Sequence, residues 1–381
     1  MKRFIDYIAL GAAGSVLLFL SACGADERTE EIPASRVPIE VYLNADGGAS
    51  TYSTEEGTSA FLMFWDETGF NAWVNSNDAQ PSPAFTCQQS GTIDDYTYAS
   101  GVAYQVPHEY LPNNKYYYAA GYAPAEALTS SKGFTQLTVN EAYQDATTDF
   151  LSCDAKEEHR GAADDRFIEE EHELQFRHLT ARIRFVGVRE EVMWSKIGVN
   201  HVNITLSEGN GLCIPVTFQK KVNANANQHQ STYVASELSD SKQITIEGTD
   251  EYIPATSEGL TLGSCYVLHD KLPERYNPFT EPAEQDGTIT LTFDIEANLS
   301  YVMGDGEYES YRTAKWENQR VTIQTVTGDA LYPGYEYIVT IRFENESISL
   351  QGIQKAWENG GTHYLPITPP SDETQASGNN E

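Results

Sequence analysis

The chain has 381 residues and carries 24 lysines and arginines against 56 aspartates and glutamates, a formal net charge of −32. A surface this acidic argues against binding to nucleic acid or to anionic lipid headgroups, and it favours solubility outside the cell. The length is sufficient for two domains of ordinary size.

The first residues have the pattern of a bacterial export signal. Lys2 and Arg3 precede an apolar run of 13 residues from Ile8 to Leu20, which is typical of a secretory signal and is shorter than the roughly 20 residues that cross a bilayer. The run ends in Leu20-Ser21-Ala22-Cys23-Gly24, which resembles the lipobox of bacterial lipoproteins. This resemblance implies a signal peptide in residues 1–23, cut before Cys23, and a thiol that carries a lipid such as palmitate. The alternative is an ordinary signal peptide that leaves Cys23 free.

An acidic linker at residues 24–36 is predicted to lead into an N-terminal β-sandwich at residues 37–172. The apolar residues of this segment alternate, or fall in short runs of the aromatic and β-branched side chains that strands prefer. No stretch of ten residues there shows helical periodicity. The predicted strands are Val37–Leu43, Phe61–Trp65, Val102–Val106 and Tyr116–Tyr122.

The stretch from Leu174 to Val188 is the most informative one. Its odd-numbered residues from Leu179 to Phe185 are apolar and alternate with polar residues, which is the period of a half-buried strand. Leu174 and Phe176 have the opposite parity, so the pattern slips near His178. A β-bulge at this point would let both sets face one core. A very acidic loop precedes the stretch, and we therefore predict a domain boundary between residues 172 and 173.

A C-terminal β-sandwich is predicted at residues 173–365, followed by a disordered polar tail at residues 366–381. A turn, Tyr332-Pro333-Gly334, precedes the longest alternating run, and a second tight turn at Glu344–Glu346 predicts a hairpin. Short strands separated by turns, with no helices, indicate two antiparallel sandwiches. The predicted strands are Val202–Leu206, Ile289–Ile295, Tyr335–Phe343 and Ser347–Leu350.

Four cysteines remain after the proposed signal: Cys87, Cys153, Cys213 and Cys265. An exported protein can form disulfides, and the predicted boundary leaves two cysteines on each side. Cys87–Cys153 and Cys213–Cys265 are the expected pairs, one of three possible pairings. The alternative is four buried thiols, because domains of this size need no covalent staple. No Cys-x-x-Cys spacing occurs, which excludes the common zinc and redox motifs.

The sequence contains no motif for catalysis. The His-Glu pairs at His108 and His172 lack a second histidine four residues on, which excludes zincin chemistry. No nucleophile elbow, P-loop or dinucleotide fingerprint follows a strand. Carboxylates are abundant, but none stands out as the pair that a carboxylate-dependent hydrolase needs. We therefore predict that the protein is not an enzyme and has neither catalytic residues nor a cofactor.

Four further features offer side chains that could form a site. Asp305-Gly306-Glu307 and Asp164-Asp165 offer the oxygens that Ca²⁺ prefers, but neither matches a full calcium-binding loop, so no metal site is predicted. His178 is interpreted as a structural residue near the bulge. The 23 tyrosines are consistent with a surface that stacks on carbohydrate, and equally with half-exposed sheet faces.

Several segments together resemble the fimbrillin family of the Bacteroidetes, the Mfa-like and FimA-type fimbrial subunits. Besides the lipobox, the similarity rests on five segments in a fixed order that span most of residues 37–361. They are Tyr116–Pro124, Asp149-Phe150-Leu151, Phe176–Ile183, Leu331–Tyr337 and the ending Ile353…Trp357…Gly360.

This resemblance implies two transthyretin-like, seven-stranded sandwiches and a structural or adhesive role in type V-like fimbriae on the outer membrane. Family subunits are exported as lipoproteins, and stalk subunits are then cut after an arginine, for which Arg36 is the first candidate here and Arg28 the second. Removal of the first strand opens a groove that a strand of another subunit fills. The expected partners are other fimbrial subunits, the outer membrane through the lipid, and a host protein or glycan receptor.

Two departures from the family pattern favour a tip, anchor or accessory subunit over a stalk subunit. In the family the cut usually lies beyond the first strand, whereas no arginine or lysine follows Arg36 until Lys115. The charged, proline-rich C-terminus is also a poor donor strand. The alternative function is a stand-alone surface lipoprotein that presents aromatic residues to a glycan.

Overall fold

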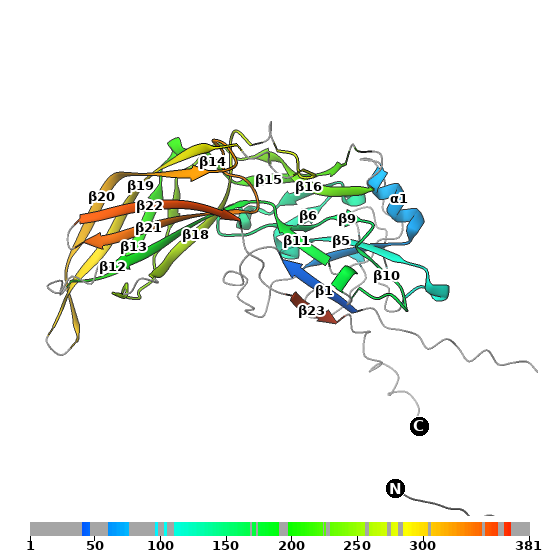
Figure 1. Ribbon diagram of the computed structural model, residues 1–381, viewed down its shortest axis with the longest axis horizontal. Coiled ribbons are helices and arrows are strands. Elements are labelled where there is room, and N and C mark those ends of the chain that lie inside the picture. The colour runs from blue at the N-terminus through cyan, green and yellow to red at the C-terminus, as the bar shows by residue number, and fades with distance from the viewer. Residues whose placement is uncertain are drawn as a thin grey trace, which may run out of the picture. The chain divides into compact units, whose positions relative to one another are not determined.

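The computed structural model describes residues 40–45, 60–75, 96–97, 103–104, 110–167, 170–172, 174–189, 197–223, 225, 229–255, 259–272, 276–280, 285–303, 306–344, 347–356 and 362–366. Contacts between residues divide the chain into Met1–Arg36, which lies outside these ranges, and Val37–Glu381, to which all of them belong. The architecture below is that of the second unit (Figure 1).

The fold is mostly β, as predicted, with strands gathered into three larger sheets and one two-stranded sheet. The seven-stranded sheet has the order β10-β5-β8-β11-β1-β23, and β2 also pairs with β5. Its strands are β1 (Glu40–Ala45), β2 (Phe61–Trp65), β5 (Tyr117–Ala123), β8 (Leu151–Cys153), β10 (Arg160–Gly161), β11 (Leu174–His178) and β23 (Thr362–Pro366).

The five-stranded sheet has the order β6-β7-β15-β16-β9, and the nine-stranded sheet the order β14-β18-β12-β21-β22-β20-β19-β13-β17. The five strands are β6 (Leu128–Ser130), β7 (Gln136–Val139), β9 (Ala155–Lys156), β15 (Pro215–Val222) and β16 (Gln230–Leu238). The nine strands are β12 (Ala181–Arg189), β13 (Ile197–Leu206), β14 (Leu212–Cys213), β17 (Ile244–Ile246), β18 (Leu260–His269), β19 (Gly287–Val302), β20 (Tyr308–Thr325), β21 (Tyr335–Glu344) and β22 (Ser347–Ala356). The small sheet pairs β3 (Tyr96–Thr97) with β4 (Ala103–Tyr104).

The seven-stranded and nine-stranded sheets are mixed, which corrects the expectation of purely antiparallel sandwiches, whereas the five-stranded sheet is antiparallel throughout. β1 pairs with β11, β12 with β21, and β20 with β22, all in parallel. Each of these pairs joins strands that are not consecutive, so the chain crosses over and returns in the same direction. Strands from both sides of the predicted boundary share the five-stranded and seven-stranded sheets. The boundary at residues 172/173 and the transthyretin-like topology stay predictions.

The stretch from Leu174 to Val188 is two strands in two different sheets, not one strand with a bulge. β11 ends at His178 in the seven-stranded sheet, and β12 begins at Ala181 in the nine-stranded sheet. Leu174 and Phe176 pack into one core, and the apolar residues of β12 pack into another. The slip in parity therefore marks the point where the chain leaves one sheet for the next.

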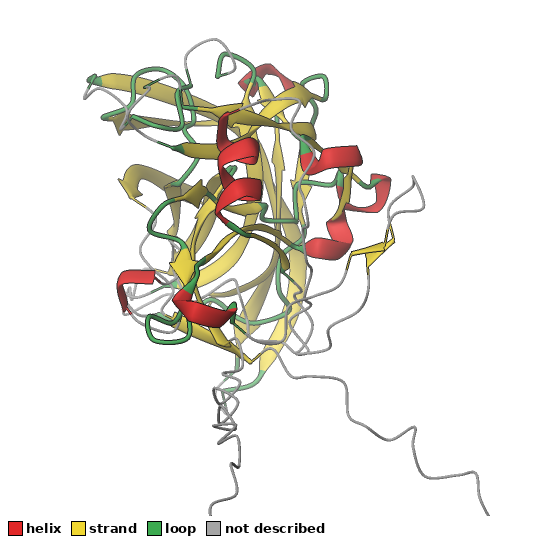
Figure 2. Ribbon diagram, turned by 90° about the vertical axis from the view of Figure 1, so that its right-hand side faces the viewer, coloured by secondary structure: helices red, strands yellow, loops and turns green. Residues whose placement is uncertain are grey.

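One α-helix, α1 (Glu67–Asn75), interrupts the β-structure of the described residues where no helix was predicted. Asp66 caps it by accepting a hydrogen bond of 2.8 Å from the Gly69 amide. Phe70, Trp73 and Val74 are buried with the spacing of one helix face, and the helix packs on β2, β5, β9 and β16 (Figure 2). With nine residues it was too short for its period to stand out. No helix in the described ranges is long and apolar enough to cross a membrane.

The nine-stranded sheet surrounds an aliphatic core built from long strands. β19 and β20 have 16 and 18 residues and form the longest hairpin (Figure 1). Buried and exposed residues alternate along β19, and β21 pairs with β22 as the predicted hairpin. We call this cluster of buried apolar residues the aliphatic core. Its members include Ile183, Leu291, Ile295, Ile323 and Val339.

The seven- and five-stranded sheets enclose an aromatic core. β2 and β5 are buried along their whole length, with one face in this core and the other in a third cluster that includes Leu62 and Phe64. A Cβ on Gly121 of β5 would lie 2.6 Å from the Phe61 carbonyl oxygen, so the close approach of the two strands requires glycine. The aromatic core contains Phe61, Trp65, Phe70, Trp73, Tyr118, Tyr122, Phe134, Phe150, Phe218 and Tyr233.

Candidate functional site

The first described strand, β1, lies inside the seven-stranded sheet, between two partners. On one side β1 pairs in parallel with β11, with Leu43 opposite Leu174 and Ala45 opposite Phe176. On the other side it pairs antiparallel with β23, the last described strand. Among the described strands, β23 has no other partner. Loss of β1 would therefore expose the backbone edge of β11 and leave β23 unpaired.

The processing residues predicted upstream of this strand lie outside the described residues. Cys23, Arg28 and Arg36 belong to the unit Met1–Arg36, and lipidation at Cys23 and cleavage at either arginine stay predictions. The strand predicted at Val37–Leu43 is placed by the structure at Glu40–Ala45. Arg36 is therefore four residues away from the first paired residue.

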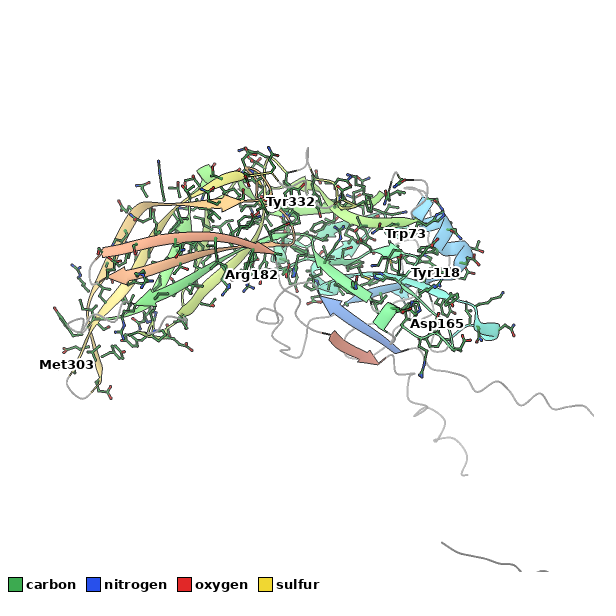
Figure 3. All side chains as sticks on the ribbon, in the orientation of Figure 1. Trp73, Tyr118, Asp165, Arg182, Met303 and Tyr332 are labelled. Atoms are coloured by element: carbon green, nitrogen blue, oxygen red, sulfur yellow. The ribbon has the colours of Figure 1, made fainter. Side chains whose placement is uncertain are left out.

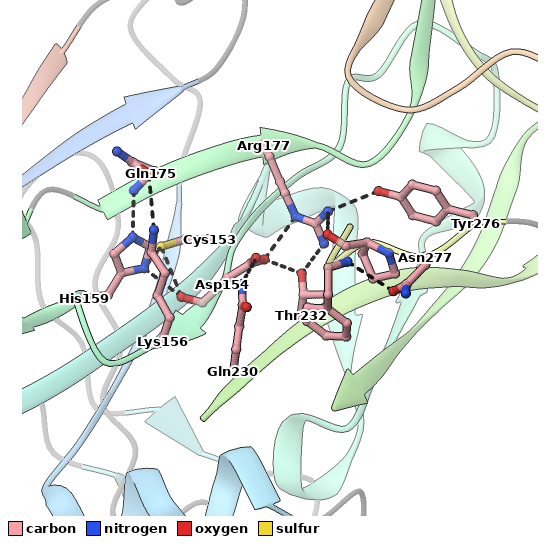
Figure 4. A network of polar contacts seen from close by, with 12 residues as sticks. Cys153, Asp154, Lys156, His159, Gln175, Arg177, Gln230, Thr232, Tyr276 and Asn277 are labelled. Atoms are coloured by element: carbon pink, nitrogen blue, oxygen red, sulfur yellow. Dashed lines mark hydrogen bonds and ion pairs between the residues drawn. The ribbon is translucent and has the colours of Figure 1, made fainter. Parts of the chain in front are cut away.

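The next strand of the sheet carries a buried polar network centred on Arg177. The guanidinium donates through Nε to Asp154 Oδ1 at 3.0 Å, through Nη1 to Tyr276 Oη at 3.1 Å, and through Nη2 to Thr232 Oγ1. Thr232 in turn donates to Asp154, as does Gln230 at 3.1 Å. Figure 4 shows these bonds converging from β11, β16 and the segment after β8.

The charges of this network cancel. Burial opposes the positive form of Arg177, but the Asp154 carboxylate and the Tyr276 hydroxyl more than compensate, so the pKa of Arg177 is raised above its ordinary value. The side chains of Arg177 and Asp154 are 21% and 12% exposed. The guanidinium and the carboxylate are thus a permanent ion pair whose hydrogen bonds fix the strands around it.

Arg177 also forms hydrogen bonds to the loop 276–280, which lines a cavity. Beyond its bond to Tyr276 Oη, Nη1 lies 3.5 Å from the Pro278 carbonyl oxygen, and Lys221 Nζ donates to the Tyr276 carbonyl oxygen at 3.5 Å. Asn277 Oδ1 accepts the Phe279 amide at 3.2 Å, which closes an Asx turn. These bonds fix the loop 276–280 before any ligand is present.

The cavity, which we call the Tyr276 cavity, has a volume of about 310 Å³. This volume is near the lower end of the range of small-molecule sites, about 300–1,000 Å³. The Tyr276 and Tyr332 rings meet edge to face, with centroids 5.4 Å apart, and Tyr332 lies on the turn before β21 (Figure 3). The apolar part of its lining consists of Tyr276, Pro278, Phe279, Tyr332, Pro333 and Tyr335.

The polar part of the lining comes from Arg177, Gln230, Asn277 and Thr280. Arg177 is the sole charged residue among the lining residues, and Asp154 neutralises it. Burial, together with Tyr276 and Tyr335, raises the pKa of Tyr332, so its phenol stays protonated at neutral pH. The cavity is consequently electrically neutral.

A cysteine and a histidine lie side by side beneath the network, with Cys153 Sγ 3.3 Å from His159 Nδ1. Burial raises the pKa of Cys153 well above its ordinary value and lowers the pKa of His159 to about 3. His159 Nδ1 bonds to the Asp154 carbonyl oxygen at 2.7 Å, and Nε2 accepts the Gln175 amide at 3.4 Å. Both groups are neutral at pH 7, so the pair lacks the thiolate that a nucleophilic cysteine requires.

The expected Cys213–Cys265 disulfide is wrong. Cys153, Cys213 and Cys265 are all buried free thiols. Cys213 lies opposite Leu268 across the β14–β18 ladder, three residues from Cys265, a spacing of about 10 Å along a strand that a disulfide does not span. An odd offset also directs the two side chains to opposite faces. Cys87 lies outside the described residues, so its pairing with Cys153 stays a prediction.

The other candidates from the sequence are occupied by structural contacts. Asp165 accepts from Tyr116 Oη and pairs with His172 Nε2, both at 2.8 Å. No group of three metal-ligating side chains occurs within the described ranges, and Asp305 lies outside them. His178 Nδ1 lies 2.7 Å from Asp149 Oδ2, and both side chains are buried. This arrangement is consistent with a structural histidine.

Sequence reasoning did not single out the residues of the Arg177 network. In the sequence, Arg177 stands out only as part of the segment Phe176–Ile183. One signal was available, because an arginine on a half-buried strand needs a buried carboxylate partner. Its main partners, Thr232 and Tyr276, are 55 and 99 residues away in the sequence, and no local pattern connects them.

No protein-family model matches the chain, and no curated protein matches it. Among solved structures, a fimbrial protein from Bacteroides vulgatus is similar over 84% of this chain and 99% of its own length, at 12% identity and a TM-score of 0.45. A protein from Bacteroides ovatus, described as a candidate cell adhesion protein, covers 85% and 98% at 14% identity and a TM-score of 0.41. The C-terminally truncated tip fimbrial protein Mfa3 from Porphyromonas gingivalis covers 84% and 100% at 9% identity and a TM-score of 0.29. All three of these solved structures are described as fimbrial or cell adhesion proteins.

Proposed function

We propose that the protein is a fimbrillin-type subunit of the cell surface, anchored through a lipid on Cys23, with a structural or adhesive role and no catalytic one. The observation that carries the proposal is the place of β1. This first described strand lies between β11 and β23 rather than at the edge of the sheet. Its position between β11 and β23, which we call the slot, is one that a strand from another subunit could occupy if β1 were absent.

The position of β1 also favours a terminal or accessory subunit. A cut after Arg36 leaves Glu40–Ala45 attached to the rest of the chain, and no lysine or arginine occurs between this strand and Lys115. The subunit therefore keeps its own strand in the slot. With the slot closed it accepts no donor strand, as expected of a tip or anchor subunit.

The first experiment is to determine the N-terminal residue and the lipid content of the protein taken from its native cell surface, by mass spectrometry. We expect a lipidated Cys23 followed by the intact linker. A start beyond Ala45 would instead identify a stalk subunit with an open slot. An unlipidated start at another small residue of the signal would contradict the anchor.

The slot is tested with a protease site inserted between Ala45 and Ala60. The uncut protein should stay monomeric. The cut protein, freed of β1, should bind a synthetic peptide of residues 37–45 or form polymers, as measured by size-exclusion chromatography with light scattering. A peptide with the same residues in scrambled order is the control. A cut protein that stays monomeric, folded and unable to bind the peptide would refute strand addition at this slot.

A further inference from the structure

We propose that the Tyr276 cavity binds one uncharged sugar ring of an extracellular glycan. The cavity is bounded by the loop 276–280, by the turn at Tyr332–Pro333 and by the polar network of Arg177. It takes no part in strand pairing at β1. The inference therefore goes beyond the proposed function and does not require assembly.

The apolar part of the cavity suits the carbon face of a pyranose. Tyrosine and phenylalanine rings present flat apolar surfaces, and sugar rings present C–H groups that stack on them, while the tyrosine hydroxyls remain available for hydrogen bonds. Tyr276, Phe279 and Tyr332 all line this space. The edge-to-face contact between Tyr276 and Tyr332, and the bond from Arg177 to Tyr276 Oη, fix the orientation of these rings in advance.

The hydrogen-bonding groups suit hydroxyls, which both donate and accept. Tyr276 Oη accepts from Arg177, so the phenol keeps its own proton for another acceptor. Gln230 uses its amide nitrogen on Asp154, which leaves its carbonyl oxygen as an acceptor. Asn277 uses its oxygen on the Phe279 amide, which leaves its amide nitrogen as a donor. The cavity therefore offers two donors and one acceptor.

Charge decides against an acidic or a basic ligand. The one charged side chain in the lining, Arg177, donates from all three of its nitrogens within the protein and is neutralised by Asp154. An anionic ligand would also meet the field of a chain with a net charge of −32. A cation would lie next to the positively charged Arg177 guanidinium, which lines the cavity. The site thus selects a neutral ring.

A proline-rich peptide is the competing ligand, because aromatic and proline residues also line grooves that bind polyproline helices. The C-terminal sequence Pro366-Ile367-Thr368-Pro369 would be such a peptide. Pro366, however, is already paired opposite Glu40 in β23, and of these four residues only Ile367 and Thr368 carry an amide proton that the Gln230 carbonyl oxygen could accept. A sugar hydroxyl satisfies this acceptor, and the sugar is the better match.

The experiment is saturation-transfer NMR on the purified full chain. The probes are the methyl glycosides of glucose, galactose and mannose, with glucuronic acid and a peptide of residues 362–371 as the charged and proline-rich alternatives. We expect at least one neutral glycoside to receive saturation, and glucuronic acid and the peptide to receive none. An absence of saturation transfer to all three glycosides, or stronger transfer to glucuronic acid or the peptide, would overturn the assignment.

Three variants locate the binding site. Tyr276→Ala removes a stacking ring and should weaken binding about tenfold. Thr280→Trp fills the cavity from an exposed position without removing any packing, which covers the case that Tyr276→Ala does not fold. Tyr301→Ala is the matched control, since this tyrosine is 49% exposed on β19, away from the cavity. Unchanged binding in Thr280→Trp, or equal loss in Tyr301→Ala, would place the sugar elsewhere.

Discussion

The aliphatic and aromatic cores of this protein are built on different plans. In the aliphatic core, four of the 29 described buried residues are aromatic, whereas in the aromatic core ten of 19 are. Beside the first, the long strand β19 alternates between buried and less buried residues, whereas beside the second the short strands β2 and β5 are buried on both faces.

The difference shows what a sheet needs on each of its faces. A sheet with one solvent-exposed face needs apolar side chains only at every second position of each strand. Branched aliphatic residues pack well at these positions. β2 and β5 are covered on both faces, so neighbouring residues of one strand must fill two cores at once. Large rings supply that volume from few positions. Four tests address the contrast.

The largest effect is expected from truncation of a ring. Phe218→Ala removes a fully buried ring that lies 5.4 Å from the Phe150 ring in the aromatic core, and should lower the free energy of unfolding by about 4 kcal/mol. Leu291→Ala in the aliphatic core should cost about 3 kcal/mol. Urea denaturation measures both. An equal or larger loss for Leu291→Ala would mean that the two cores do not differ in packing energy per residue.

The buried ion pairs of the two regions provide the second test. Glu336 is 3% exposed and is shared by Arg184 at 2.6 Å, Arg182 at 3.3 Å and Lys355 at 3.4 Å. Burial alone would raise its pKa, but these cations hold it below the ordinary value. Glu336→Gln leaves three cations without their anion and should cost about 3 kcal/mol.

Asp154→Asn is the counterpart next to the aromatic core. It should cost about 2 kcal/mol, because Arg177 is partly exposed and water can solvate its charge. Urea denaturation of the two variants at pH 7 gives the comparison. A smaller loss for Glu336→Gln than for Asp154→Asn would show that burial does not set the strength of these pairs.

The third test uses pH. Burial lowers the pKa of His159 from 6.5 to about 3, so between these values the unfolded chain binds a proton that the folded chain does not. Stability should therefore fall as the pH is lowered from 6.5, by about 3 kcal/mol at pH 4.5. In urea denaturation at several pH values, His159→Gln should remove this contribution to the slope of the free energy of unfolding against pH. His201→Gln, at an exposed histidine, is the control and should leave the slope as it is.

The smallest effect concerns a contact at the surface of the nine-stranded sheet. Tyr308 is 38% exposed and lies over Gly198, where an added Cβ would be 2.3 Å from Tyr308 Cε1. Gly198→Ala should cost about 1 kcal/mol, because the half-exposed ring can move aside. The same substitution in a Tyr308→Ala background should cost less. A cost that is equal in both backgrounds would trace the effect to the backbone.

The residues that were predictable from the sequence are those whose partners are close in the chain. The alternation from Tyr335 to Phe343 gave β21, and the turn after it gave the hairpin with β22. The slip near His178 was visible, but its meaning depended on which sheet each half joins. α1 was hidden because its nine residues offer only two turns. The bond between Arg177 and Tyr276 spans 99 residues, and no single-sequence pattern encodes it.

The pairing of β1 with β23 has a consequence for the time at which the sheet can form. Glu40 lies opposite Pro366, 326 residues later in the chain. One neighbour of β1 is therefore synthesised long after β1 itself, and contacts between such distant residues form slowly. Until residues 362–366 have been synthesised, β1 is an edge strand, held by β11 alone and open to pairing with other chains. During synthesis the protein therefore passes through a state in which β1 can pair with another chain before β23 is available.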